Sequence, residues 1–447
     1  MSRITILATF LVAASITVAA CQTKSADEGD DPSFIVPQSP LLGAFERKVG
    51  LIAYIGADGN VYTVDQSGQN PAQITDDARL REGNFHYYNF PTWSPDGKSL
   101  AFYGVQGTSE IDLVSTVYTS DAEGQTLVET YTSDRHVPIY LMWSPDSSQV
   151  TFISNIAGGP GLVLNMVPAA GGESQVLDVG APYYWDWLPD SSGVLVHTGG
   201  PASTDAEARL ALLTLTEGVV EDTLALRPAA FKSPALSPDG SKVLLAIEAD
   251  GESKLVITDR LGNIENEIDT VDGPVAFAWS PDGQRVAYIV GQAGQQLAIG
   301  KLMFVELGEQ LETAETEQDQ VLAFFWAPDS KQVAYLTLAQ FTPEPDPEAP
   351  ESATAENMQY YLKLYVSDTA GKAKRLFSFV PPDDFWRMLP YFDQYARSAT
   401  IWSPDSQNLV VPAYISADAS AILVVSASGV TEPRLLQEGA IAFWSAK

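Results

Sequence analysis

A three-residue turn signal, Ser-Pro-Asp, recurs along the chain and constrains its fold more than any other feature. It or a close copy begins at Ser94, Ser144, Leu188, Ser237, Ser280, Ala327 and Ser403. The intervals between the aspartates are 50, 44, 49, 43, 47 and 76 residues, and the last interval contains two visible insertions. Periods of about 40–50 residues are typical of arrays in which each unit is a four-stranded propeller blade.

Each unit has the same internal order. An apolar stretch that usually ends in Trp enters the Pro-Asp-Gly or Pro-Asp-Ser turn, and a second apolar stretch such as VAYIV follows at once. Pro presets φ at the first corner, Asp bonds its own backbone and Gly accepts positive φ, so the motif predicts a hairpin turn. Where Ser replaces Gly, at Ser147, Ser191, Ser330 and Ser406, we expect strain or another turn geometry. A third strand and a second turn follow, which gives strands A to D.

The two ends of the repeat array complement each other. Residues 49–75 contain strands B, C and D without a strand A, and residues 440–445 contain a strand A alone. Joining them in one sheet would close the ring and protect its sheet edges. We therefore predict an all-β fold, a single eight-bladed β-propeller of four-stranded blades over residues 46–447, with seven blades as the alternative.

These motifs resemble the TolB-type (WD40-like) propeller repeats of TolB and of prolyl-oligopeptidase-like peptidases, from about Gly50 to Lys447. The resemblance implies the fold and not the function, because propellers host unrelated activities. TolB itself has six blades and an additional α/β domain, so a partnership with a Tol–Pal system is not carried over. The repeated tryptophans are expected to wedge between blades, and the repeated aspartates to stabilise turns.

The N-terminus predicts export. Arg3 precedes seventeen uncharged residues, and Val18-Ala19-Ala20 lead into Cys21, the only cysteine. Residues 1–20 therefore indicate a cleaved signal peptide. The stretch resembles the lipobox of bacterial lipoproteins, which implies that Cys21 is lipidated and anchors the protein to a cell membrane or outer membrane; an ordinary secretory peptide is the alternative. Residues 22–33, with Gly, Pro and clustered acids, predict a flexible tether, and residues 21–45 as a random coil would span about 25–30 Å.

Composition excludes one class of partner. The formal net charge is −32, so we expect no nucleic-acid binding through a basic patch.

No G-x-S-x-G elbow, EF-hand or metal-ligand spacing is present, so we predict no catalytic residue, metal or cofactor, although a weaker calcium site among the acids stays open. His86 and His136 with Asp134 or Asp186 form the one alternative metal or acid–base grouping. We expect a monomer.

The D–A and B–C connections share the face opposite the Ser-Pro-Asp turns, and function should be sought there. Aromatic and basic residues of four D–A connections are predicted to converge around the channel mouth, either as a binding cup or as a plug. The candidate ligand-binding residues are Phe85, His86, Tyr87, Tyr88, Arg135, His136, Tyr183, Tyr184, Trp386, Arg387, Tyr391 and Arg397. The Pro- and acid-rich residues 342–356 are expected to form either a mobile flap on this face or a solvated insertion without a role.

Three functions remain open from the sequence. The first is a non-enzymatic, lipid-anchored propeller at the cell surface or in the periplasm that binds a peptide, glycan or protein. The second is an extracytoplasmic hydrolase or lyase acting on an extracellular polymer through His86 and His136. The third is an accessory subunit of a transporter or envelope complex.

Overall fold

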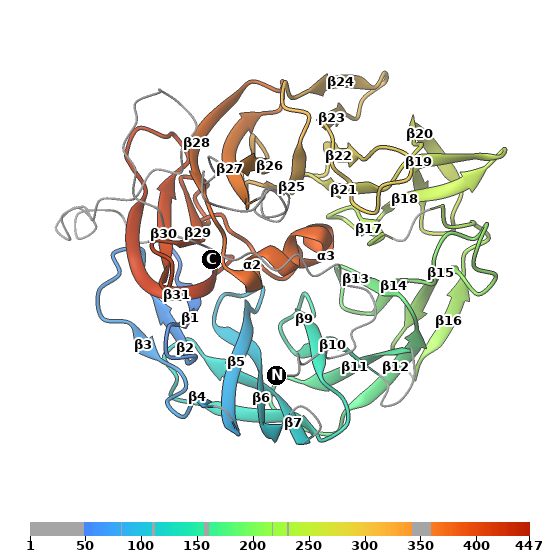
Figure 1. Ribbon diagram of the computed structural model, residues 1–447. Helices are drawn as coiled ribbons and strands as arrows, with labels where there is room; N and C mark the ends of the chain where they lie inside the picture. The colour runs from blue at the N-terminus through green and yellow to red at the C-terminus, as the bar shows by residue number, and fades with distance from the viewer. Residues whose placement is uncertain are drawn as a thin grey trace, which may run out of the picture.

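The computed structural model describes residues 49–81, 83–109, 112–155, 161–216, 218–229, 232–341 and 359–447. The predicted signal peptide, Cys21, the tether and the predicted flap at 342–356 lie outside the described residues. Figure 1 shows that the described chain forms a ring of antiparallel sheets, with α2 and α3 near its centre.

Each sheet is a meander that runs from the channel to the outer wall. The first three internal units are β5(Asn84–Trp93), β6(Ser99–Ser109), β7(Asp112–Asp121) and β8(Leu127–Ser133); β9(Pro138–Trp143), β10(Gln149–Asn155), β11(Leu162–Pro168) and β12(Gln175–Gly180); and β13(Tyr183–Trp187), β14(Gly193–Thr198), β15(Arg209–Thr214) and β16(Val220–Thr223). A short strand, β4(Arg79–Arg81), adds to the first of them.

The next three units continue the pattern. They are β17(Ala235–Leu236), β18(Lys242–Ala249), β19(Glu252–Asp259) and β20(Ile264–Thr270); β21(Val275–Trp279), β22(Arg285–Val290), β23(Leu302–Glu306) and β24(Glu312–Glu315); and β25(Val321–Trp326), β26(Gln332–Phe341), β27(Gln359–Asp368) and β28(Ala373–Phe379). The shortest inner strand, β17, belongs to the one unit in which Leu236 replaces the turn tryptophan.

The two ends of the described chain close the ring in one six-stranded sheet, ordered β29-β30-β31-β1-β2-β3. Its strands are β29(Asn408–Tyr414), β30(Ser420–Ser426), β31(Arg434–Trp444), β1(Ile52–Gly56), β2(Val61–Val64) and β3(Ala72–Gln73). The second half of β31 pairs with β1, with Trp444 opposite Ile52 and Phe443 opposite Ala53. The predicted closure is therefore confirmed.

Counted as hydrogen-bonded sheets, the ring has seven members, which matches the alternative count. The predicted eighth unit is contained in the six-stranded sheet. The first half of β31 pairs with β30 as an outer strand, and its second half pairs with β1 as an inner strand. Because β31 serves both units without a break, the seventh unit and the closing unit share one sheet.

The Ser-Pro-Asp turns have the predicted geometry. Ser94 Oγ donates a 2.7 Å hydrogen bond to the Asp96 carboxylate, which also accepts the Lys98 N–H. The turns that begin at Ser144, Ser237, Ser280 and Ser403 repeat both bonds, and those that begin at Leu188 and Ala327 keep only the second of them, the backbone N–H bond to the aspartate. Hydrogen bonding of this kind lowers the pKa of Asp239 to about 2, with the Ser237 hydroxyl as the largest cause.

The serines that replace Gly adopt the strained conformation, with φ of 60–63° at Ser147, Ser191, Ser330 and Ser406. Each also joins two units, because its hydroxyl accepts the N–H of the turn aspartate in the preceding unit. The hydrogen bond from Asp282 N to Ser330 Oγ is 2.9 Å long, and the one from Asp329 N to Ser406 Oγ is 3.1 Å. The turns are thus tied into a chain along one face.

The core lies between neighbouring sheets. Trp143 Nε1 donates to the Thr92 carbonyl of the preceding unit, and Trp279 and Trp402 make the equivalent bonds to Ala235 and Phe325. All three indoles are buried. The predicted wedge role of the turn tryptophans is confirmed for these residues.

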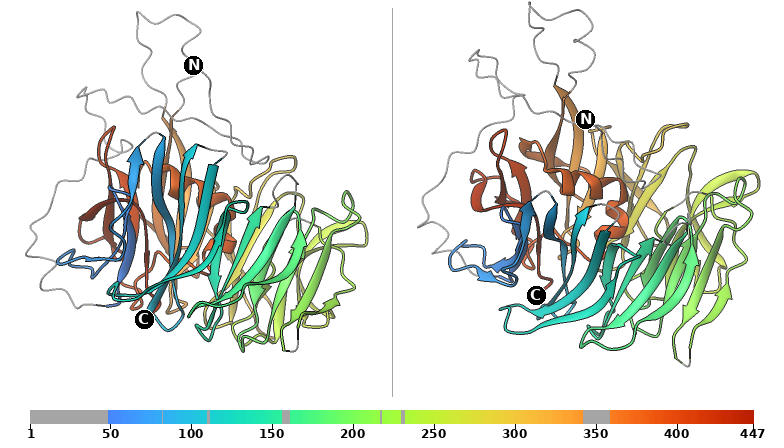
Figure 2. Two further views of the ribbon diagram at one scale, coloured as in Figure 1. Left: turned by 90° about the horizontal axis from the view of Figure 1, so that it is seen from below. Right: turned by 60° about the horizontal axis from the view of Figure 1, so that its bottom comes forward.

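Two units are taller than the rest. β5, β6 and β7 have 10, 11 and 10 residues, and β26 and β27 have 10 each. Since hydrogen bonds hold the Ser-Pro-Asp turns at one level, the additional residues project from the opposite face, which we call the mouth face. Both hairpins rise on this side in Figure 2.

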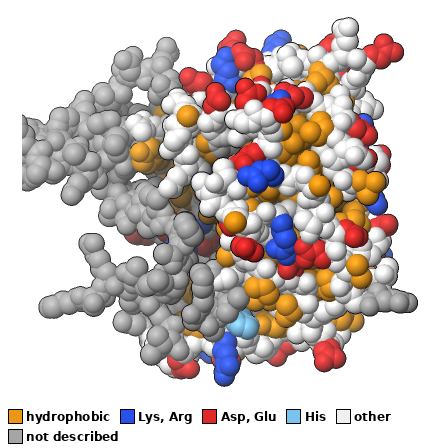
Figure 3. All heavy atoms as spheres, turned by 90° about the vertical axis from the view of Figure 1, so that its right-hand side faces the viewer, with side chains coloured by type: hydrophobic (Ala, Val, Ile, Leu, Met, Phe, Trp, Pro, Cys, Tyr) orange, Lys and Arg blue, Asp and Glu red, His pale blue; other side chains and the backbone are white. Residues whose placement is uncertain are grey.

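The outer wall carries mixed charges. Figure 3 views it from the side of β16 and β20 and shows acidic, basic and apolar side chains interspersed. Ion pairs on this side join Lys242 to Glu265 at 2.9 Å and Lys254 to Glu267 at 3.0 Å. Isolated exposed apolar residues such as Val220 lie among them, which is usual for a solvated surface.

Candidate binding face

The long connection between β28 and the seventh unit lies at the centre of the ring (Figure 1). It forms α2(Asp383–Met388), η2(Leu389–Tyr391) and α3(Phe392–Tyr395), and we call residues 381–399 the axial plug. Two acids stand in the first turn of α2 and Arg387 in its last, which suits the helix dipole. Phe385 and Met388 lie on one side of this helix and are completely buried, so the apolar side faces the ring.

Gln394 fastens α3 to the third and fourth units. Its amide donates a 3.0 Å bond to the Trp185 carbonyl and accepts from the Trp185 N–H and the Ser233 hydroxyl, both at 3.3 Å. Its backbone carbonyl accepts the Tyr140 hydroxyl at 2.7 Å. The side chain is 3% exposed, so these bonds are shielded from water. The plug is therefore a fixed part of the ring.

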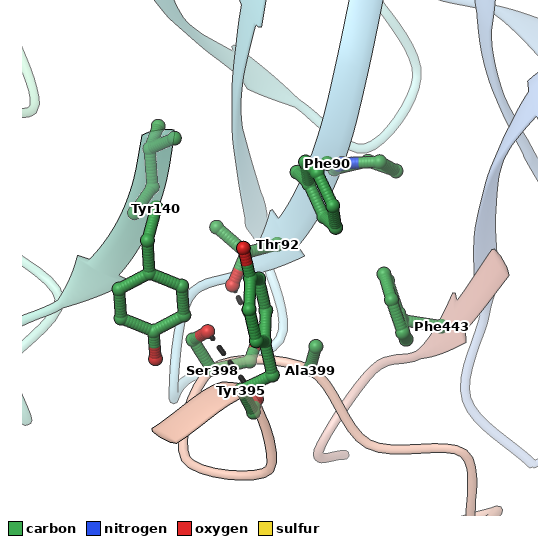
Figure 4. A pocket seen from close by; sticks show the side chains of 9 residues that line it. Phe90, Thr92, Tyr140, Tyr395, Ser398, Ala399 and Phe443 are labelled. Atoms are coloured by element: carbon green, nitrogen blue, oxygen red, sulfur yellow. Dashed lines mark hydrogen bonds between the residues drawn. The ribbon is translucent and has the colours of Figure 1, made fainter. Parts of the chain in front are cut away.

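Packing and charge complete the attachment. The Tyr395 ring lies edge-on to Tyr140 and also packs against Phe90. The Arg397 guanidinium pairs with the Asp186 carboxylate, which also accepts the Leu236 N–H. Figure 4 shows the cavity that remains between the plug and β5. Its volume of about 10 Å³ is the size of one water molecule, so it is too small for an organic ligand.

The outward side of the plug offers polar and aromatic groups. Arg387 is exposed and Trp386 half-buried, next to the half-buried Asp384. Burial raises the pKa of Asp384, and the nearby Arg387 charge opposes this change. Burial and the Asp384 charge also raise the pKa of Tyr87 on β5. Tyr87, Asp384 and Arg387 are therefore close enough to interact electrostatically.

The taller first unit extends this surface with half-buried aromatics. Phe85 and Tyr87 stack with ring centroids 6.1 Å apart. Tyr131 on β8 lies within 3.3 Å of His136 Nδ1, and Phe85, Tyr87 and Tyr131 all pack against one apolar cluster shared by the first and second units. Ile139 at the start of β9 is 41% exposed. The surface thus runs from α2 across the tops of two units, and we call it the mouth surface.

The twelve predicted residues therefore separate into two groups. Those with exposed or half-buried side chains are Phe85, Tyr87, Arg135, His136, Trp386, Arg387, Tyr391 and Arg397. The others are buried, with exposed fractions of 4% for His86, Tyr88 and Tyr184 and 2% for Tyr183. The structure does not test whether any of them binds a ligand, and that role stays a prediction.

The expectation of loops was wrong at two places. Residues 84–90 belong to strand β5, because β4 pairs with its first residues and forms a hairpin, with Leu80 opposite Phe85. Tyr183 and Tyr184 belong to β13, opposite Thr198 and His197. In both cases an inner strand begins earlier than the turn-based pattern predicts. The buried side chains of β5 and β13 pack within the ring. The Tyr183 hydroxyl, for example, donates to Asp178 of the preceding unit at 2.8 Å.

The alternative metal or acid–base grouping does not form, because its members have different partners. His86 Nδ1 lies 3.2 Å from Asp77 Oδ2, and burial lowers its pKa against the pull of that carboxylate. His136 faces Tyr131, while Asp186 is paired with Arg397. Among the residues that the structure describes, no group of three or more His, Cys, Asp or Glu side chains is placed to hold a metal ion.

Sequence reasoning missed several residues that shape this face. Gln394 and Asp393 gave no signal, because they lie in an unrepeated segment. Asp77 joins Tyr88, whose hydroxyl donates to it at 2.6 Å, and His86 into one cluster. Gly83, which has φ of 74° in the connection between the paired residues Arg81 and Asn84, is a turn signal that could have placed β4 and β5 correctly.

The comparisons with known proteins bear on the fold alone. No protein-family model and no curated protein matches the chain. Dihydro-heme d1 dehydrogenase NirN is similar with a TM-score of 0.52 and 15% identity, over 89% of this chain and 76% of that one. A eukaryotic initiation factor has a TM-score of 0.49 and 14% identity, over 90% and 98% of the two chains.

TolB from Acinetobacter baumannii has a TM-score of 0.39 and 13% identity, over 77% of this chain and 82% of that one. Within the described part of the chain, no helix is long and apolar enough to cross a membrane. The ring of antiparallel meanders shows that the described chain is a β-propeller, and the similarity to NirN concerns this fold alone.

Proposed function

We propose that this protein is a non-enzymatic binding propeller that is lipid-anchored through Cys21 outside the cytoplasm and uses its mouth surface to hold a peptide, glycan or protein. The observation that carries the proposal is the axial plug. Its helices lie at the centre of the ring (Figure 1), where Phe385 and Met388 are buried while Arg387 is exposed and Trp386 half-buried. A ligand would therefore rest on the mouth surface.

The chemistry of this surface suits binding. Half-buried Tyr and Trp rings provide contact area at low entropic cost, and Arg is enriched with them at binding hot spots. Tyr87 and Trp386 supply such rings, Phe85 adds a further half-buried aromatic ring, and Arg387 and Asp384 add nearby polar groups of opposite charge. Loops and strand ends on a rigid scaffold are the usual place for such residues.

The binding test compares the wild-type protein with a Tyr87→Ala, Trp386→Ala, Arg387→Ala variant in capture from cell-envelope extract and on glycan arrays. We expect the variant to keep its fold, because these side chains are not fully buried, and to lose at least tenfold in affinity. Leu261→Ala, in the turn between β19 and β20, is the control, since Leu261 is 78% exposed and lies outside the mouth surface. Equal capture by the triple variant and the control would refute the proposed surface.

Anchoring is tested separately. Cells that express the protein are labelled with radioactive palmitate and then fractionated. The wild type should carry label and partition with membranes, whereas Cys21→Ser should carry none and be released. Label on the Cys21→Ser variant, or none on the wild type, would contradict lipidation without bearing on the binding surface.

A further inference from the structure

Asp393 is the least explained charged side chain in the axial plug. It lies in α3 at the centre of the ring and is 2% exposed (Figure 1). Among the described residues, neither carboxylate oxygen has a hydrogen-bond partner. No ion pair within the described residues includes it, and the nearby Arg397 pairs with Asp186 while donating only to the Asp393 backbone carbonyl at 3.2 Å.

Such an arrangement is unfavourable in either protonation state. A buried carboxylate without a counter-charge loses its hydration and gains nothing in return. A neutral carboxyl group would still need an acceptor for its O–H and a donor for its carbonyl. Buried polar groups in native proteins are satisfied almost without exception, so the surroundings of Asp393 are incomplete as they stand.

The neighbouring side chains indicate what is missing. Gln394 and Tyr395, which follow Asp393, are committed to the third unit and to Tyr140. Tyr184 lies close to Asp393, because it precedes Trp185, the residue that Gln394 bonds. Burial, and then the Asp393 charge, raise the pKa of this phenol, so its oxygen stays protonated and neutral at physiological pH. A carboxylate beside a neutral oxygen atom is an environment that attracts positive charge.

We propose that Asp393 is the anionic ligand of a cation bound at the channel axis, beside Tyr184. The cation is either a small inorganic ion or a primary ammonium group. It would neutralise the carboxylate and occupy its free lone pairs, which would fix α3 in the ring. This site is distinct from the mouth surface, because α2 exposes Arg387 and Trp386 while Asp393 faces inward.

The test measures thermal and denaturant unfolding of the purified protein after exchange into choline chloride, an organic salt whose cation is too bulky for the site. Sodium, potassium, calcium and methylammonium chloride are then added separately at constant ionic strength. We expect one of them to stabilise the wild type saturably, by about 100-fold in the folded-to-unfolded ratio at 100 times its Kd. Stabilisation by sodium, potassium or calcium would indicate an inorganic cation, whereas stabilisation by methylammonium alone would indicate a primary ammonium group.

Asp393→Asn keeps the shape and removes the charge, so it should not respond. Asp134→Asn is the control for bulk salt effects, because Asp134 is 77% exposed and should leave the response intact. If the wild type and Asp393→Asn respond equally to every cation, the proposal is overturned.

A second measurement covers the case in which Asp393→Asn does not fold. The stoichiometry of the bound ion is determined on the wild type by elemental analysis and ammonium assay after dialysis against choline chloride containing a small excess of the stabilising cation. About one equivalent per chain supports the site. If no cation is bound and none stabilises the protein saturably, Asp393 is a buried acid without a counter-charge, and the proposal is overturned.

Discussion

The serines that replace Gly in the turns affect the free energy of unfolding in two opposing ways. Their hydroxyls bond the neighbouring unit, whereas their positive φ strains the backbone, and mutation can separate the two effects. Ser406 is 1% exposed, has φ of 60° and accepts the N–H of Asp329 from the neighbouring unit. Removing the hydroxyl in Ser406→Ala deletes this partly buried bond and leaves the Asp329 N–H without its partner, which costs about 1–2 kcal/mol. Ser406→Gly deletes the same bond but relieves the left-handed backbone strain, worth about 1 kcal/mol. The glycine variant should therefore be about 1 kcal/mol more stable than the alanine variant.

The assay is guanidinium chloride unfolding followed by tryptophan fluorescence, with the slope m checked for constancy before midpoints are compared. Ser330→Ala and Ser330→Gly provide a second pair, because Ser330 makes the equivalent bond to Asp282. Ser148→Ala is the control, since its hydroxyl bonds only within its own exposed turn. If both alanine variants unfold at the wild-type midpoint, the bonds between turns do not stabilise the ring. Equal destabilisation by Ala and Gly would show that no strain is stored there.

Three further predictions concern other parts of the ring. Burial lowers the pKa of His197 to about 4, below its unfolded value of about 6.5. The unfolded state therefore binds more protons, and the free energy of unfolding should fall by about 3 kcal/mol between pH 7 and pH 4. Unfolding curves of His197→Gln at the two pH values should show a smaller loss. Gln394→Ala should cost about 2–3 kcal/mol and raise hydrogen exchange in residues 383–398, and unchanged exchange there would contradict its anchoring role. Phe443→Ala should cost about 3–5 kcal/mol and lower the thermal midpoint, because Phe443 is 1% exposed at the closing pair of strands.

The periodic part of the fold could be predicted because each repeated residue has a local role. The Asp of each turn bonds its own backbone, and the Trp before it fills the space to the preceding unit, so seven copies of one pattern report one geometry. Ring closure followed from the same logic, since a lone inner strand at one end and three outer strands at the other are complementary. Trp444 opposite Ile52 confirms it.

The candidate site was harder to predict because it depends on contacts that no local pattern encodes. Trp386 and Tyr184 look equally suited to ligand binding in the sequence, yet one is half-buried on the outside of the plug and the other is 4% exposed beneath it. The difference arises where Gln394 docks on Trp185, more than two hundred residues away in the chain. A residue pair of that kind is set by tertiary packing alone.

The two faces of the ring tolerate changes of sequence differently, and this explains why binding is proposed on only one of them. On the turn face, each unit must match its neighbour, because the Ser406 or Ser330 hydroxyl has to meet a backbone N–H of the preceding turn. Gly240 shows how tight this match is, since a Cβ there would lie 2.7 Å from Pro189 of the preceding turn. The mouth face has no such requirement, and its connections range from a two-residue hairpin to the axial plug. New side chains can accumulate there without disturbing the ring, so this is the face on which a propeller can acquire a ligand.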